Sequence, residues 1–187
     1  TARVPLIIRW PGGPKGRADS ALHYQTDMAA TVLELVGARV PENWDGASFA
    51  GAFLEGRPSG RPFLVCGNCA WTCQRSARWD DWILLRTYHD GLKDLPEVML
   101  FNVAEDPHQT RNLAAERPDL VNAGLAKLEL WHAEMMKRSD SDVDPLWNVI
   151  REGGPFHTRN QLEHYVKRLR ETGRAHHAEA LLRRHRR

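Results

Sequence analysis

Four short β-rich stretches joined by short polar links constrain the fold of this chain more than any other feature. They occupy residues 62–66, 74–79, 81–88 and 98–103. β-Branched and aromatic residues, which favour strands, recur in them. Parallel strands need crossover connections of about a dozen residues or more, and most of the links here are shorter. The spacing therefore predicts an antiparallel sheet, with a hairpin turn at Asp80-Asp81.

Helical periodicity flanks this predicted sheet on both sides. From Thr26, which can cap a helix, apolar positions recur at helical spacing as far as Gly37, and Ser48 can cap a shorter helix. A longer helix begins at Pro118 and should pack on the sheet. Three short helices are expected from Pro145 onward, the middle one from residue 158 to residue 172.

The apolar run at residues 3–10 predicts a buried strand, which ends at the proline- and glycine-rich residues 11–14. This run begins almost immediately after Thr1, which is not a methionine, and no leader precedes it. We expect an upstream portion, in which any export signal would lie. The sequence therefore assigns no localisation.

The overall charge excludes some classes of partner. The formal net charge is +2, from 26 basic and 24 acidic side chains, so no global field favours nucleic acid. No apolar run approaches the roughly 18–20 residues of a membrane span. The basic residues at 183, 184, 186 and 187 have no interleaved aromatic side chains, which indicates a solvated end. We predict neither a nucleic-acid nor a membrane partner.

Cys66, Cys69 and Cys73 lie within eight residues, and their odd number leaves at least one thiol unpaired. A structural zinc site needs four ligands, and no second Cys/His pair is well placed. The acidic residues at 140, 142 and 144 lack the glycine and distal glutamate of a calcium hand, so they are interpreted as a polar linker. Reduced thiols are favoured over a disulfide or a metal site, and no metal ligands are predicted.

Three segments, in order, resemble the sulfatase family, whose fold is that of the alkaline-phosphatase-like superfamily. Residues 3–12 are similar to the strand that follows the family's glycine-rich catalytic turn. Residues 25–37 and the following 45–48 are similar to its Asp-x-x-Pro-Thr helix and its Asp-Gly-x-Ser loop. Residues 100–113 are similar to its Leu-Tyr-Asp-Leu…Asp-Pro-x-Glu-x-x-Asn-Leu signature near the C-terminus.

The matching segments depart from the family pattern at three positions. Ala30 stands where the family usually has proline, Asn102 where it has aspartate, and Gln109 where it has glutamate. The stretch after Trp131 looks like the ends of bacterial sulfatases of the heparan N-sulfatase and arylsulfatase types.

The resemblance implies an α/β fold with three parts. Residues 1–60 would end the main sulfatase domain, contributing one or more strands and a helix of its sheet. Residues 61–138 would form a C-terminal subdomain in which a small antiparallel sheet packs on a long helix, and residues 139–187 would form a helical tail.

The resemblance also implies that the full-length enzyme hydrolyses sulfate esters or sulfamates of small molecules or carbohydrates. The family uses calcium and a formylglycine made from Cys or Ser in Cys/Ser-x-Pro-x-Arg. Asn68, Trp71 and Arg75 stand where that motif requires proline after the three cysteines, so none of these is converted. We expect the nucleophile and calcium ligands upstream, no catalytic residue in this chain, and no activity of the chain alone.

Three residues are predicted to contribute to the rim of a substrate pocket, because loops positioned by a sheet collect specificity residues. Trp71 could stack on a sugar or aryl ring, Arg75 could meet an anionic group, and His89 ends a strand beside a turn. Each also has a structural interpretation, as an edge of the core, a surface charge and a turn residue.

Two other functions compete with the sulfatase interpretation. One is a phosphodiesterase or phosphonate hydrolase of the same superfamily, which a different nucleophile would reveal. The other is a non-catalytic binding or structural module, which should fold cooperatively by itself. We expect poor folding of the chain alone, because a strand at residues 4–10 without its neighbours would expose backbone edges and an apolar face.

Overall fold

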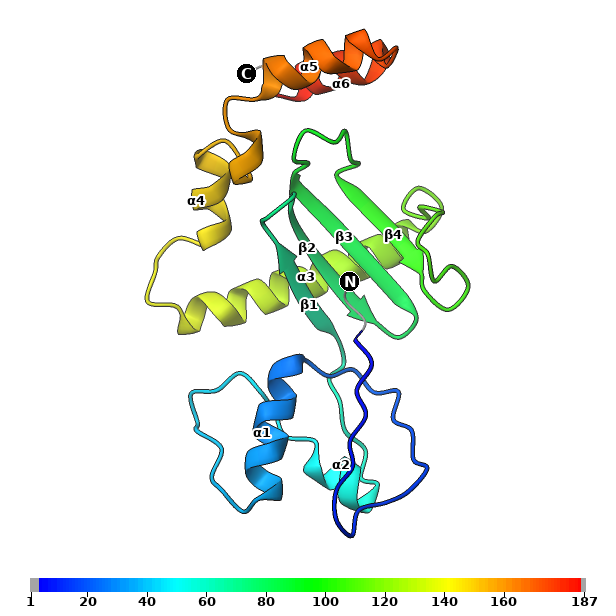
Figure 1. Ribbon diagram of the computed structural model, residues 1–187, viewed down its shortest axis with the longest axis vertical. Coiled ribbons are helices and arrows are strands. Elements are labelled where there is room, and N and C mark those ends of the chain that lie inside the picture. The colour runs from blue at the N-terminus through cyan, green and yellow to red at the C-terminus, as the bar shows by residue number, and fades with distance from the viewer. Residues whose placement is uncertain (1–3, 186–187) are drawn as a thin grey trace. The chain divides into compact units, whose positions relative to one another are not determined.

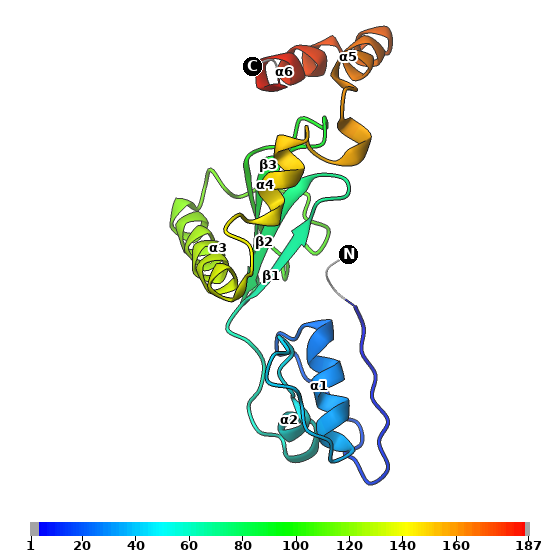
Figure 2. The same ribbon diagram turned by 90° about the vertical axis from the view of Figure 1, so that its left-hand side faces the viewer.

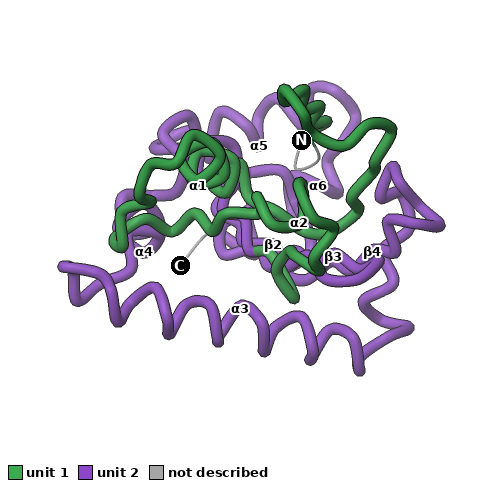
Figure 3. Tube along the Cα trace, turned by 90° about the horizontal axis from the view of Figure 1, so that it is seen from below, with its two compact units in different colours: residues 1–64 green, residues 65–187 purple. Residues whose placement is uncertain are grey.

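The computed structural model describes residues 4–185 (Figure 1). The chain divides into two compact units, with the boundary between Leu64 and Val65 (Figure 3). The three-part division at residues 60 and 138 stays a prediction. Arg3, Arg186 and Arg187, which belong to segments discussed above, lie outside the described residues.

Unit 1 contains two helices, α1 (Gln25–Leu35) and α2 (Ala50–Glu55). Helix α1 does not use Thr26 as its cap, because the Asp27 carboxylate accepts the Tyr24 N–H at 2.7 Å and the helix begins one residue earlier. Gly37 follows its last turn with φ +76°, a conformation that glycine adopts without strain. The N-cap residue of α2 is Phe49 and not the predicted Ser48, although the Ser48 hydroxyl accepts the Ala50 N–H of the first turn at 3.1 Å.

The centre of unit 1 is a buried carboxylate, that of Asp27. Asp27 accepts hydrogen bonds from the Ala47 N–H at 2.7 Å and from Arg61 Nη2 at 2.5 Å. Arg61 also donates to the Asp45 carbonyl at 2.9 Å. Burial alone would raise the pKa of Asp27, but the hydrogen bonds, chiefly that from Arg61, outweigh it and lower the pKa. Asp27 therefore links α1 to two segments that are distant from it in sequence, at Ala47 and at Arg61.

The prediction of a strand at residues 3–10 is wrong over the described residues. Residues 4–10 form no strand. Val4 and Leu6 are half exposed or more, and Ile7 is 92% exposed. A strand needs a neighbour to pair its backbone N–H and C=O groups, and unit 1 has no strand among its residues 4–63. The apolar run thus has the composition of a strand but no partner.

Unit 2 is built on a four-stranded sheet in the order β1 (Leu64–Asn68), β2 (Cys73–Trp79), β3 (Trp82–His89) and β4 (Val98–Asn102). β2 pairs antiparallel with β3, and β3 with β4. The pairing of Trp79 with Trp82 leaves Asp80-Asp81 as the hairpin turn. Both the antiparallel sheet and this turn were predicted from the sequence and are confirmed.

A long helix, α3 (Pro118–Arg138), lies along one face of the sheet (Figures 1 and 2). The strand register aligns Ala77, Leu84 and Leu100 across three strands, and all three are fully buried. Gly124 of α3 lets the helix approach closely, since a Cβ there would lie 2.8 Å from Leu84 Cβ. The predicted packing of this helix on the sheet is confirmed.

The remainder of unit 2 is helical, with α4 (Pro145–Arg151), the 3₁₀ turn η1 (Phe156–Thr158), α5 (Leu162–Glu171) and α6 (Ala175–His185). The middle tail helix was predicted to begin at Thr158. It begins instead at Leu162, because Asn160 adopts φ +59°, a left-handed conformation that interrupts a right-handed helix. Helices α5 and α6 pack side by side (Figure 1).

Candidate functional site

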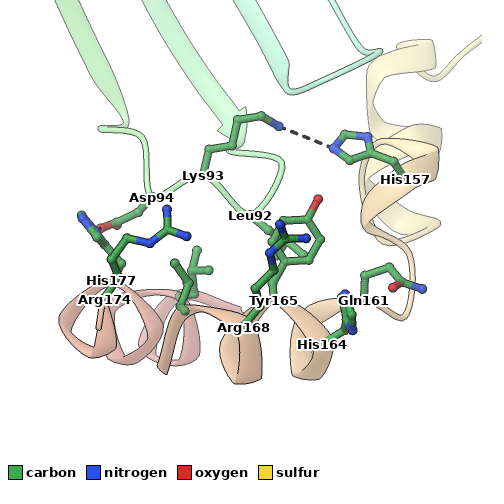
Figure 4. Close-up of a pocket in the computed structure, with 12 residues that line it drawn as sticks. Leu92, Lys93, Asp94, His157, Gln161, His164, Tyr165, Arg168, Arg174 and His177 are labelled. Carbon is green, nitrogen blue, oxygen red and sulfur yellow. Dashed lines mark hydrogen bonds and ion pairs between the residues drawn. The ribbon is translucent and has the colours of Figure 1, made fainter. Parts of the chain in front are cut away.

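A cavity within unit 2 has a volume of about 690 Å³, within the range of small-molecule sites. The β3–β4 loop forms one side of it, and η1, α5 and α6 form the others (Figure 4). Three cationic side chains line it, Lys93, Arg168 and Arg174, against the single carboxylate of Asp94. Three histidines complete its polar lining, His157, His164 and His177. The site is suited to an anion.

The β3–β4 loop is positioned by the buried Asp90. Its carboxylate accepts the Leu92 N–H at 3.0 Å, Arg184 Nη1 at 2.6 Å and His185 Nε2 at 2.8 Å. Burial alone would raise the pKa of Asp90, but the hydrogen bonds from His185 and Arg184 outweigh it and lower the pKa to about 2. Asp90 therefore stays charged and holds the end of α6 against the loop.

Lys93 connects this loop to the turn between β1 and β2. Its ammonium group donates to the Trp71 carbonyl at 2.8 Å and to the Gly91 carbonyl at 3.2 Å, and lies 3.5 Å from His157 Nε2. The Trp71 ring faces both partners, with its centroid 5.9 Å from the Lys93 ammonium and 5.2 Å from the His157 ring. Burial lowers the pKa of Lys93. Trp71, Lys93 and His157 thus form a single group at the rim of the pocket.

Of the three site residues predicted from sequence, only Trp71 lies beside the pocket, and it is 65% exposed. His89 lies behind the loop, where its Nδ1 accepts the Gly91 N–H at 3.1 Å and its ring centroid lies 5.0 Å from that of His185. Burial, followed by the proximity of His185, lowers the pKa of His89 and favours the neutral ring. A substrate-binding role for either residue stays a prediction.

Arg75 lies elsewhere, at a cavity of about 130 Å³ beside α3 and α4. Its guanidinium meets both oxygens of Asp144, with distances of 2.6 and 2.8 Å, and stacks over the Trp131 ring. His132 Nε2 is 3.1 Å from the same carboxylate but without hydrogen-bond geometry. Asp144 lies in the link between α3 and α4, as the predicted polar linker requires, but it is buried and also connects this link to β2. The substrate-binding role of Arg75 stays a prediction.

Arg168 and Arg174 were not predicted from the sequence, although they are the most available cations of the pocket. Arg174 donates to the Thr172 hydroxyl at 3.2 and 3.1 Å. Within residues 4–185, neither arginine forms an ion pair with a carboxylate. The one sequence signal for this site was the histidine content of the tail, since five of the nine histidines follow residue 150.

The three cysteines are free thiols, exposed at Cys66 and Cys69 and buried at Cys73. Burial raises the pKa of Cys73 to about 12, so its thiolate is inaccessible near neutral pH. Within the described chain, no three His, Cys, Asp or Glu side chains gather as metal ligands.

Comparison with curated proteins relates the chain to a family. It is 30% identical over 134 residues to arylsulfatase K of Gallus gallus, covering 66% of this chain and 24% of that protein. It is 25% identical over 161 residues to an N-acetylglucosamine-6-O-sulfatase of Bacteroides thetaiotaomicron, covering 81% of this chain and 28% of that protein. This chain is a relative of the sulfatases. The similarity is to their C-terminal portion, as the sequence motifs predicted.

The chain spans about a quarter of the length of these sulfatases. No protein-family model matches it. The predicted proximity to the heparan N-sulfatase type stays a prediction.

Two solved structures are similar in fold to about three fifths of the chain. One, a protein in complex with its substrate D-glucosamine-2-N,6-O-disulfate, matches 61% of this chain and 24% of its own, with a TM-score of 0.50 and 21% identity. The other, described with the metabolism of glycosaminoglycans by Bacteroides thetaiotaomicron, matches 60% of this chain and 27% of its own, with a TM-score of 0.50 and 23% identity. The α/β architecture of the matched part of the chain is therefore found among known structures. None of the described helices is both long enough and apolar enough to cross a membrane.

Proposed function

We propose that this chain is the C-terminal part of a sulfatase, and that the full-length enzyme hydrolyses sulfate esters or sulfamates carried by a carbohydrate. The observation that carries the proposal is the similarity to arylsulfatase K, which extends over 134 residues of this chain but only 24% of the longer protein. The N-acetylglucosamine-6-O-sulfatase match covers a similar share, 28%, of that protein and suggests a sulfated sugar as substrate.

The exposed apolar run of unit 1 supports the same proposal. Val4, Leu6 and Ile7 combine strand composition with exposure to solvent. A larger sheet, contributed by the rest of a sulfatase, would pair their backbone groups and cover their side chains. In this view unit 1 is the end of a catalytic domain, and the strands that would pair with its apolar run are encoded elsewhere in the protein.

Sulfate-ester hydrolysis needs a nucleophile, and a metal or cationic groups that stabilise the developing negative charge. The calcium and formylglycine of the family supply these when present, but residues of this chain do not fit either group. No cysteine is followed by the required proline, and no three carboxylates, thiols or imidazoles converge in the region described. We therefore assign no catalytic step to this chain.

The test is to express the complete open reading frame that contains this sequence, and residues 1–187 alone, and to assay both with calcium on p-nitrophenyl sulfate and on a disulfated glucosamine. We expect sulfate release from the full-length protein only. Replacement of the Cys or Ser of an upstream Cys/Ser-x-Pro-x-Arg motif by Ala should abolish it. Sulfate release by residues 1–187 alone would overturn the assignment of the catalytic groups to the missing part.

The same assay addresses the two other functions. Full-length protein that cleaves bis-p-nitrophenyl phosphate or a phosphonate ester, but not sulfate esters, would identify a phosphodiesterase or phosphonate hydrolase. An open reading frame without any upstream catalytic motif, together with a cooperative and reversible thermal transition of residues 1–187, would identify a non-catalytic module.

A further inference from the structure

The cavity of unit 2 contains cationic side chains that no carboxylate of the described chain neutralises. Asp94 is its only carboxylate, and that group is already engaged by His177 Nδ1 at 3.1 Å and by Arg184 Nη2 at 3.4 Å. Arg168 and Arg174 have no carboxylate partner within residues 4–185. Unpaired cations in a concavity attract an anion from solution, because the low-dielectric walls concentrate their field.

The two arginines lie in different parts of the cavity. Figure 4 shows Arg174 beside His177 and Asp94, and Arg168 beside Tyr165. They come from different segments, since Arg168 is on α5 and Arg174 precedes α6. A ligand with one anionic group would meet one of them, whereas a ligand with two separated anionic groups would meet both with charge-assisted hydrogen bonds.

The rim adds an aromatic surface. The exposed Trp71 ring is held next to the cavity by His157 and by Lys93, whose ammonium group is fixed through the Trp71 carbonyl. Tyr165 supplies a second ring in the lining. Aromatic faces beside polar groups suit a ligand that has both an apolar face and ionic substituents, as a charged sugar ring does.

We propose that this pocket binds a saccharide that carries at least two anionic groups, with Arg168 and Arg174 each meeting one group and Trp71 contacting the sugar ring. The choice of a doubly anionic ligand rests on the pocket alone. The choice of a saccharide rests on the proposed function. We assign no bond-breaking step to the pocket residues.

The test measures binding to the full-length protein by calorimetry, with the Cys or Ser of its upstream Cys/Ser-x-Pro-x-Arg motif replaced by Ala. A disulfated glucosamine, unsulfated glucosamine and inorganic sulfate are three separate probes. Arg168→Gln and Arg174→Gln remove one charge each, and Arg183→Gln is the matched control, because Arg183 is an exposed arginine of α6 outside the pocket. Circular dichroism of each variant checks that the helices are retained.

We expect the disulfated sugar to bind, and binding to weaken about tenfold in each pocket variant, equivalent to about 1.4 kcal/mol. Arg183→Gln should stay within about twofold of the parent chain, and added salt should weaken binding. Trp71→Ala should weaken binding of the sugar and leave binding of inorganic sulfate unchanged. Unsulfated glucosamine should not bind.

The proposal is overturned if the disulfated sugar does not bind to the folded protein, or if Arg183→Gln weakens binding as much as the pocket variants do. Inorganic sulfate that binds as tightly as the sugar, with the same dependence on the two arginines, would overturn the assignment of a saccharide. A full-length protein that binds the sugar in this way but cleaves no sulfate ester would overturn the proposed function and leave the pocket assignment intact.

Discussion

Unit 2 encloses apolar side chains between a sheet and a helix, whereas unit 1 encloses a carboxylate among short helices and loops. In unit 2, Ala77, Leu84 and Leu100 form a continuous row beneath α3. In unit 1, Asp27 holds its neighbours through hydrogen bonds while Ile7 and other apolar side chains remain exposed. Apolar burial is the main favourable contribution to the free energy of folding. The buried apolar side chains of unit 2 should therefore stabilise it, whereas unit 1 depends more on a few polar contacts.

The largest expected effect lies in the core of unit 2. Leu84→Ala removes a fully buried side chain and should lower the free energy of unfolding by about 2–5 kcal/mol. Hydrogen exchange should show the loss in the amides of β2, β3 and α3, with those of α1 unchanged. Leu130→Ala, on the exposed face of α3, is the control and should change stability by less than about 0.5 kcal/mol. Equal loss of protection in α1 would contradict the separation of the units.

A somewhat smaller effect is expected at the carboxylate of unit 1. Asp27→Asn removes the charge that faces Arg61 and should destabilise unit 1 by about 2–3 kcal/mol. The change should appear as faster amide exchange in α1 and α2. Glu34→Gln, an exposed change on the same helix, should leave exchange unaltered. If Asp27→Asn left amide exchange as unchanged as Glu34→Gln does, apolar contacts and not the Asp27 hydrogen bonds would stabilise unit 1.

Acid should weaken unit 2 through Asp90. Because the pKa of Asp90 falls from its ordinary 3.8 to about 2 in the folded protein, its stabilising contribution is fully present above about pH 4 and is lost as the pH falls toward 2. The contribution corresponds to about 2 kcal/mol. Thermal unfolding at pH 5 and pH 2.5 should therefore show a smaller pH effect for Asp90→Asn than for the parent chain. Asp81→Asn should retain the parental pH effect.

The smallest effect on stability is expected in the exposed run of unit 1. Ile7→Lys should change the free energy of unfolding by less than about 0.5 kcal/mol, since Ile7 is 92% exposed. It should nevertheless reduce binding of a hydrophobic dye such as anilinonaphthalene sulfonate, because it interrupts an exposed apolar patch. A loss of more than about 1 kcal/mol would show that the run already packs within this chain.

Local sequence patterns predicted most of unit 2. The β-rich stretches, the hairpin turn at Asp80-Asp81 and the helix from Pro118 each follow from signals within a few residues. The predicted strand at residues 3–10 failed over the described residues, because composition favours an extended chain but only a neighbouring strand can pair it. The composition of this run thus predicts a strand, but the described part of the chain contributes no neighbouring strand to pair with it.

The candidate site was much less predictable. Its cations come from the β3–β4 loop, α5 and the residue before α6, and no sequence spacing reveals that these meet. Arg75 was predicted for a pocket, but its partner Asp144 lies 69 residues away and could not be anticipated from either segment. Trp71 was predicted from a local signal, its position in a loop next to a strand, and its substrate-binding role stays a prediction.

The hydrogen bond between Asp90 and Arg184 joins residues 94 positions apart, whereas the β2–β3 hairpin closes through a two-residue turn. Contacts between distant residues cost more chain entropy to form and generally follow local ones during folding. The hairpin should therefore be present in the transition state before α6 docks on the β3–β4 loop. Substitutions at Arg184 should accelerate unfolding while leaving the refolding rate nearly constant, so the wall of the pocket would be the first part of unit 2 to open.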